Sequence, residues 1–129
     1  MLALDRDTGE LAWVRVHDDY VYASPAIARQ LVYVGSYDHR LYALDAVSGE
    51  VRWSFDAGER ISGSASVVGD VVYVSTLAKV PSEGRTFGLD AASGERLLTF
   101  PDGRYSPAVG IEGMLVMTGV RTLYGLTPR

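Results

Sequence analysis

The sequence has 129 residues, of which 47% are hydrophobic and 22% are charged, with a formal net charge of −4. This balance predicts one compact domain with a hydrophobic core, and the mild acidity argues against a general nucleic-acid-binding surface. The lack of cysteine excludes disulfides and thiolate metal sites, and no apolar run is long enough to predict a membrane-spanning segment.

The chain divides into units with a period of about forty residues, which is typical of a repeat architecture. Residues 1–17 predict the two outer strands of a first unit. Residues 21–57 and 61–100 each predict four strands, and residues 104–127 predict three strands without an outer fourth. The runs are short, rich in Val, Tyr and Leu, and bounded by Gly, Asp, Ser or Pro. Because four strands joined by tight turns form a propeller blade, the sequence predicts an all-β fold of about three blades.

One segment carries the repeat most clearly. The residues from Ala3 to Trp13 recur from Ala43 to Trp53, and a degenerate copy runs from Gly88 to Leu98. Each copy contains Asp, then Thr or Ser, then Gly at the same spacing. An Asp side chain can accept backbone N–H bonds two or three residues on, and Gly supplies the positive φ that closes a turn. We therefore expect a tight turn between the third and fourth strands of each unit.

This segment resembles the tryptophan-docking motif of the PQQ-like β-propeller repeat family, within the quinoprotein alcohol dehydrogenase-like superfamily. The positions that carry the resemblance are Ala3, Asp5, Gly9, Trp13, Ala43, Asp45, Gly49, Trp53, Asp90 and Gly94. The resemblance implies that the Trp of one blade packs on the motif of the next, which pairs Trp13 with Gly49 and Trp53 with Gly94. The third copy has Gly88 and Leu98 in place of Ala and Trp, and a fourth copy lacks its Asp, so the docking ring is incomplete on the C-terminal side.

The variable loops are expected on the face opposite the motif turns. Antiparallel neighbours place the first and third turns of a blade on one face, and the second turn and the inter-blade loop on the other. Loops on a rigid frame are where binding residues collect. The candidate binding residues on this face are Tyr20, Tyr37, Asp38, His39, Arg60, Arg104 and Tyr105.

No pattern in these loops predicts chemistry. His39 could be a metal ligand or a general base, but a solvated turn residue is the favoured interpretation because His17 is the only other histidine. Four carboxylates in these loops could gather around a divalent cation: Asp18, Asp19, Asp38 and Glu59. Their spacing matches no ordered set of metal ligands. The recurrent small residues Ser24, Ser64 and Ser106 are interpreted as parts of the innermost strands rather than as nucleophiles, and Pro25 and Pro107 suit that edge.

Three functions stay open. The favoured one is a non-catalytic scaffold that binds a protein or peptide, and the resemblance includes outer-membrane assembly propellers and extracytoplasmic sensor domains of bacterial kinases. The second is part of a PQQ-dependent dehydrogenase, for which the resemblance implies PQQ and Ca²⁺ held by Glu, Asn and Asp beneath a vicinal Cys pair. The sequence contains neither Asn nor Cys, so we expect no cofactor. The third is a part of a larger ring.

Ring closure is the open question of assembly. Known propellers have about four to eight blades, so three blades predict two uncovered blade faces. We expect either further blades of the same propeller, the favoured alternative, or a homodimer that closes a six-bladed ring. No signal peptide is visible in this sequence, although the resemblance favours a periplasmic or other extracytoplasmic location.

Overall fold

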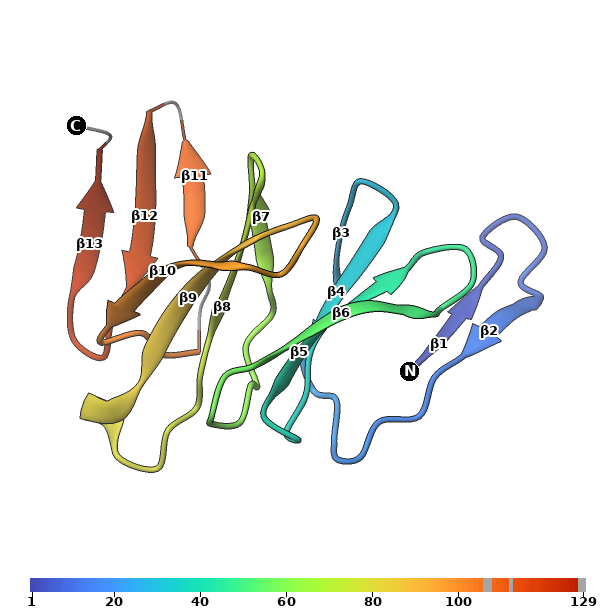
Figure 1. Ribbon diagram of the computed structural model, residues 1–129, viewed down its shortest axis with the longest axis horizontal. Helices are drawn as coiled ribbons and strands as arrows, with labels where there is room; N and C mark the ends of the chain where they lie inside the picture. The colour runs from blue at the N-terminus through green and yellow to red at the C-terminus, as the bar shows by residue number, and fades with distance from the viewer. Residues whose placement is uncertain (106–107, 112, 128–129) are drawn as a thin grey trace.

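The computed structural model of the chain describes residues 1–105, 108–111 and 113–127, and it confirms the all-β fold class (Figure 1). Four antiparallel sheets follow one another along the chain and stand side by side across the molecule. The first is a hairpin of β1 (Leu2–Leu4) and β2 (Leu11–Val14). These two strands lie within residues 1–17, the range in which two strands were expected.

The next two sheets each have four strands in sequence order. The strands of the second sheet are β3 (Ala26–Ala28), β4 (Leu31–Gly35), β5 (Arg40–Asp45) and β6 (Val51–Asp56). The strands of the third sheet are β7 (Ser66–Val68), β8 (Val71–Ser75), β9 (Arg85–Asp90) and β10 (Arg96–Pro101). A short 3₁₀ helix, η1 (Pro81–Glu83), interrupts the loop between β8 and β9.

The last sheet has three described strands. They are β11 (Val109–Ile111), β12 (Met114–Thr118) and β13 (Leu123–Leu126). The innermost strand β7 lies beside both β3 and β11, so the inner strands of successive sheets converge as the blades of a propeller do. Within the described residues, β1 pairs only with β2 and β13 only with β12, so each leaves one strand edge without a partner.

The core lies between successive sheets because the inner strands bury both of their faces. In β4, Val32 and Val34 point toward the first hairpin and pack near Trp13, whereas Tyr33 points the other way into the core shared with the third sheet. Side chains alternate along a strand, so a strand buried on both faces needs consecutive apolar residues. This explains why β4 and β8 read as continuous apolar runs rather than as alternating patterns.

The innermost strands are shorter than predicted. Ser24 and Ser64 each lie two residues before their strand, which begins at Ala26 or Ser66, and Pro25 is exposed. The inner strand pairs over only three residues, because the chain preceding it joins adjacent blades instead: the backbone N–H of Ser24 donates to Ser64 Oγ at 3.2 Å. Ser106 and Pro107 lie outside the described residues. Among the described residues, no helix is long and apolar enough to cross a membrane.

Candidate functional site

The three motif turns have one geometry. Asp45 Oδ1 accepts the backbone N–H groups of Val47 and Ser48 at 2.9 Å each, and Asp5 and Asp90 make the equivalent bonds. The glycine that closes each turn has a φ between 72° and 76°. The bond from Ser48, with the Arg52 guanidinium and the N–H of Val47, lowers the pKa of Asp45 to about 2. These carboxylates therefore accept hydrogen bonds from the backbone of their own turns.

Each tryptophan contacts the motif turn of the following sheet. The indole of Trp13 donates to the carbonyl of Ala46 at 3.0 Å, and its ring is so close to Gly49 that a Cβ there would lie 2.6 Å from Trp13 Cδ2. In the next copy, the indole of Trp53 donates to the carbonyl of Ala91 at 3.2 Å and packs on Gly94. Tyr33 also donates to the carbonyl of Ala91, at 2.9 Å. The motif therefore joins neighbouring blades through the ring, the glycine and one carbonyl.

The third copy keeps the backbone geometry without the tryptophan. Leu98 pairs with Gly88 across β9 and β10, as Trp53 pairs with Ala43 and Trp13 with Ala3, and a bulge follows in all three hairpins. Leu98 packs instead against the core that contains Tyr73 and Met117. The third copy thus keeps the Asp90 turn but has no tryptophan ring to contact a following blade.

The opposite face carries a hollow of about 590 Å³ at the loop ends of the second and third sheets. The hollow is formed by the β4–β5, β6–β7, β8–β9 and β10–β11 loops, of which the first three run along the lower edge of the view in Figure 1. The β6–β7 and β8–β9 loops are joined by the backbone N–H of Leu77, which donates to the carbonyl of Arg60 at 2.6 Å. The residues that line the hollow are His39, Glu59, Arg60, Leu77, Ala78, Lys79 and Arg104.

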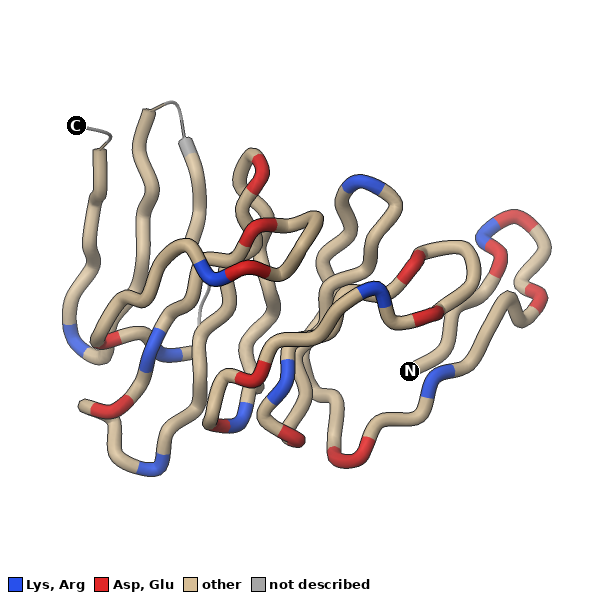
Figure 2. Tube along the Cα trace, in the orientation of Figure 1, with Lys and Arg blue, Asp and Glu red and all other residues tan. Residues whose placement is uncertain are grey.

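The hollow is locally cationic. Arg60, Lys79 and Arg104 line it together with a single carboxylate, Glu59, and the ion pairs of the described residues involve none of these cations. Nε of Arg104 is buried without a hydrogen-bond partner among the described residues. Both acidic and basic residues occur along the lower loops (Figure 2), so the excess of cations is a local property of the hollow's lining.

A ladder of aromatic rings adjoins the hollow. The rings of Tyr20 and Tyr22 lie 5.6 Å apart, those of Tyr22 and Tyr37 lie 5.1 Å apart, and the Arg60 guanidinium lies 5.3 Å above the Tyr37 ring. Arg104, which also lines the hollow, lies 4.8 Å from the Tyr105 ring centroid and donates to its hydroxyl at 3.3 Å. We refer to Tyr20, Tyr22 and Tyr37 as the tyrosine ladder.

Asp38, by contrast, supports the frame. Its carboxylate accepts the backbone N–H of Arg40 at 3.0 Å and the hydroxyl of Tyr42 at 2.9 Å. Burial and this bond raise the pKa of Tyr42 to about 12. His39 is exposed, has a φ of 74° in the β4–β5 turn, and accepts the N–H of Ala57 at its carbonyl. Its turn position is the one favoured from the sequence.

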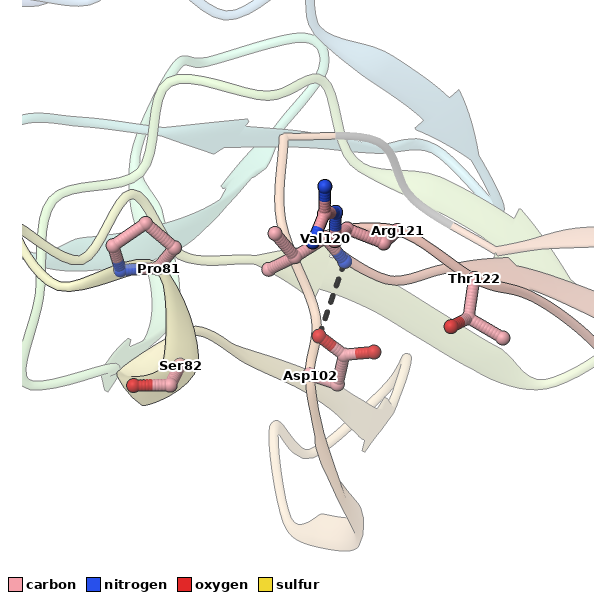
Figure 3. A pocket seen from close by; sticks show the side chains of 6 residues that line it. All are labelled: Pro81, Ser82, Asp102, Val120, Arg121 and Thr122. Atoms are coloured by element: carbon pink, nitrogen blue, oxygen red, sulfur yellow. Dashed lines mark hydrogen bonds between the residues drawn. The ribbon is translucent and has the colours of Figure 1, made fainter.

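A second hollow, of about 370 Å³, lies between η1 and the last sheet (Figure 3). Asp102 lies in its wall and accepts the backbone N–H of Val120 at 3.1 Å and the hydroxyl of Tyr124 at 2.8 Å. These bonds lower the pKa of the Asp102 carboxyl. Asp102 thus accepts a hydrogen bond from the hydroxyl of Tyr124, as Asp38 does from that of Tyr42, although the two aspartates lie in different kinds of loop. The Asp102 carboxylate is therefore engaged within the fold.

The structure brings together most of the predicted binding face. His39, Arg60 and Arg104 share the hollow, while Tyr37 and Tyr105 lie beside it under the two arginines. Sequence analysis missed Lys79 and Tyr22; their position on the predicted loop face was the signal that could have included them. In the part of the chain that the structure describes, no group of three or more His, Asp or Glu side chains could hold a metal ion.

Comparison with protein families finds a match over residues 1–123 to the model described as outer membrane protein assembly factor BamB. No curated protein sequence matches the chain. Among solved structures, BamB from Moraxella catarrhalis superposes with a TM-score of 0.79 at 21% identity, covering 98% of this chain and 39% of that chain.

Quinoprotein dehydrogenases share the same fold. The quinohemoprotein alcohol dehydrogenase from Comamonas testosteroni superposes with a TM-score of 0.72 at 27% identity, covering 79% of this chain and 18% of that chain. A europium-containing methanol dehydrogenase superposes with a TM-score of 0.71 at 23% identity, covering 80% of this chain and 21% of that one. This chain therefore spans well under half the length of the structures it resembles.

Proposed function

Because the chain belongs to the PQQ-like β-propeller repeat family whose model is described as outer membrane protein assembly factor BamB, we propose that it is a non-catalytic scaffold that binds a protein partner. The observation that supports this most directly is the hollow on the loop face, where three cations make no ion pair among the described residues and two of them lie against tyrosine rings. Tyrosine and arginine are the residues most enriched in the energetic centres of protein interfaces. The location that goes with this proposal is extracytoplasmic.

The disposition of the carboxylates supports a binding role over a catalytic one. Asp38 and Asp102 accept hydrogen bonds from a backbone N–H and a tyrosine hydroxyl, and the motif aspartates accept bonds within their turns. A general acid or base needs a free position within reach of substrate. These side chains are used to hold loops in place, which is what a rigid binding surface requires.

A site-directed cross-linker tests the binding role. The chain has no cysteine, so Val80→Cys beside the hollow and Val47→Cys on the motif-turn face give two exposed and unique attachment points for a photoreactive maleimide. In an envelope extract of the source cells, we expect a discrete adduct, identified by mass spectrometry, from the Val80→Cys probe only. Adding Arg60→Gln should remove it. Equal adducts from both probes, or an adduct indifferent to Arg60→Gln, would contradict the proposal.

We also propose that the chain acts within a larger ring. β1 and β13 each leave one edge unpaired among the described residues, and strand edges of this kind invite further pairing. Further blades of the same propeller are the favoured source, and a second copy is the alternative. Multi-angle light scattering distinguishes them: aggregation of the isolated chain supports missing blades, and a clean species at twice 14.0 kDa supports a dimer. A stable monomer would contradict both.

A part of a PQQ-dependent dehydrogenase is the second candidate, supported by the likeness in fold to two such enzymes. The residues that the resemblance implies for PQQ and Ca²⁺ include Asn and a vicinal Cys pair, and this sequence has neither residue type. Asp38 and Asp102 are hydrogen-bonded to tyrosines, which further disfavours a cation site built on them. No cofactor chemistry is therefore assigned to the chain.

A further inference from the structure

We propose that the hollow and the tyrosine ladder form one peptide site: the hollow takes the carboxylates of an extended acidic segment, and the ladder takes a proline or aromatic residue next to them. This inference rests on the proposed function and specifies the chemistry of the partner. It joins two features that lie side by side on the loop face, since Arg60 lines the hollow and lies above the ring of Tyr37.

Charge complementarity identifies the acidic half. Arg60, Lys79 and Arg104 line the hollow against one carboxylate, Glu59, in a chain whose net charge is −4. A cleft lined by one sign of charge focuses the field and raises the local concentration of the opposite charge. Exposed basic side chains elsewhere in the chain, such as Arg29 and Arg40, form ion pairs with aspartates. The cations of the hollow form no such pair with any residue that the structure describes.

The geometry of the two arginines prepares them for carboxylates. Arg60 and Arg104 each lie against a tyrosine ring, at 5.3 and 4.8 Å from its centroid. A guanidinium held over a ring keeps its N–H groups in its own plane, where they can bind a carboxylate with two parallel hydrogen bonds. Less side-chain freedom is then lost when a carboxylate binds.

The tyrosine ladder supplies the apolar half. Tyr20 and Tyr22 are 67% and 66% exposed and their rings are neighbours, and contiguous exposed aromatic surface is a mark of interaction sites. Their position is set by the backbone, because the N–H of Tyr37 donates to the carbonyl of Tyr20 at 2.9 Å. Aromatic surfaces of this kind bind proline-rich and aromatic peptide residues, because rigid rings bury area at low entropic cost.

A peptide fits this surface better than a single-stranded nucleic acid, which also combines rings with negative charge. Asp18 and Asp19 directly precede Tyr20, and the carboxylate of Asp19 accepts the backbone N–H of Tyr20. A nucleic acid carries a phosphate at every nucleotide, so phosphates next to the ladder would face these carboxylates. A peptide can place its charges in the hollow and leave its ring residues uncharged.

Calorimetry with two capped peptides tests the inference. The first probe is Glu-Glu-Glu-Pro-Pro-Tyr and the second is Glu-Glu-Glu-Ser-Ser-Ser. We expect the first to bind more tightly, both to weaken as salt is raised, and a Lys-for-Glu version of the first to show no binding. Lys79 is the only lysine of the chain, so acylation of its amine, followed by peptide mass mapping, should be slowed by the acidic probes.

Matched variants separate the two halves. The double variant Arg60→Gln with Lys79→Gln should weaken both probes about tenfold, whereas Arg6→Gln with Arg96→Gln, on the motif-turn face, should weaken neither. Tyr22→Ser should weaken the Pro-Pro-Tyr probe and leave the Ser-Ser-Ser probe unchanged. Melting curves that match the wild type show that each variant is folded.

Three outcomes overturn the inference. One is that neither acidic probe binds, or that Lys79 is acylated at the same rate with and without them. Another is that oligo-dT binds more tightly than the acidic probes at equal salt and loses that binding in the Arg60 and Lys79 double variant. The third is that the Lys-containing peptide binds as well as the acidic one. If the Val80→Cys probe still captures a discrete partner in any of these cases, the scaffold function stands and only the ligand class is wrong.

Discussion

The two faces of the molecule use polar residues in opposite ways. On the motif-turn face, Asp5, Asp45 and Asp90 bind the backbone of their own turns in the same pattern. On the loop face, the cations at the hollow make no ion pair within the described part of the chain, and Tyr20 and Tyr22 of the tyrosine ladder are exposed. Repetition therefore marks the contacts that join blades, and variation marks the surface that is left free. Substitutions on the first face should affect stability, and those on the second should affect binding.

The largest expected effect is that of Trp53→Ala. The ring joins two blades, packs on Gly94 and donates to the carbonyl of Ala91. Trp53 is partly buried against the core. Truncation of a Trp in the core costs about 3–5 kcal/mol, a large share of the stability of a small domain, so the variant should unfold or nearly so. His39→Ala, on the loop face, should shift the free energy of unfolding by less than about 0.5 kcal/mol. Chemical denaturation measures both, and comparable losses would remove the distinction between the faces.

Two glycine substitutions measure how much the docked ring contributes. Gly94 and Gly9 have φ values of 76° and 74°, so alanine strains the backbone similarly at both. A Cβ at Gly94 would lie 2.7 Å from Trp53 Cδ2, whereas a Cβ at Gly9 would have nothing within 4 Å. Gly94→Ala should therefore cost about 1–3 kcal/mol more than Gly9→Ala, because it also overpacks the interface. Equal losses in thermal melting would show that the ring contact adds nothing.

A smaller effect is expected from acid. The folded state lowers the pKa of Asp45 to about 2, so its contribution is present above the ordinary value of 3.8 and is lost as pH falls toward 2. The pKa values of Asp5 and Asp90 are lowered in the same direction, mainly by the N–H of Thr8 and of Ser93. Asp45→Asn should lower the melting temperature at pH 7 by more than it does at pH 3. A constant difference between those pH values would contradict this.

No shift at all is expected from PQQ and Ca²⁺. The sequence lacks the Asn and Cys residues that the resemblance implies for that site. A ligand at a hundred times its dissociation constant would stabilise the fold by about 2.7 kcal/mol, which thermal melting detects easily. A clear rise in melting temperature with both additives would contradict this expectation and would favour the interpretation of the chain as part of a PQQ-dependent dehydrogenase.

The sequence by itself determined the blades and their turns. Short apolar runs, separated by Asp, Ser and Gly at a constant period, specify strands and tight turns through local physics: side-chain alternation, Asp-to-backbone bonds and the positive φ of glycine. Each of these acts within a few residues. Strands and turns can therefore be predicted from a single repeat. The other repeats support the same prediction, because Asp45 and Asp90 accept equivalent backbone N–H bonds in their turns.

Tertiary structure alone decided which loops meet and what their side chains do. His39, Arg60, Lys79 and Arg104 belong to four separate loops, and they share a hollow only because consecutive blades pack at the angle their cores allow. Tyr42 donates its hydroxyl to Asp38 in the preceding turn, whereas the equivalent hydroxyl of Tyr124 donates to Asp102 in a more distant loop. No local sequence pattern predicts the second contact. Contacts between loops of different blades depend on packing distances that no single repeat encodes.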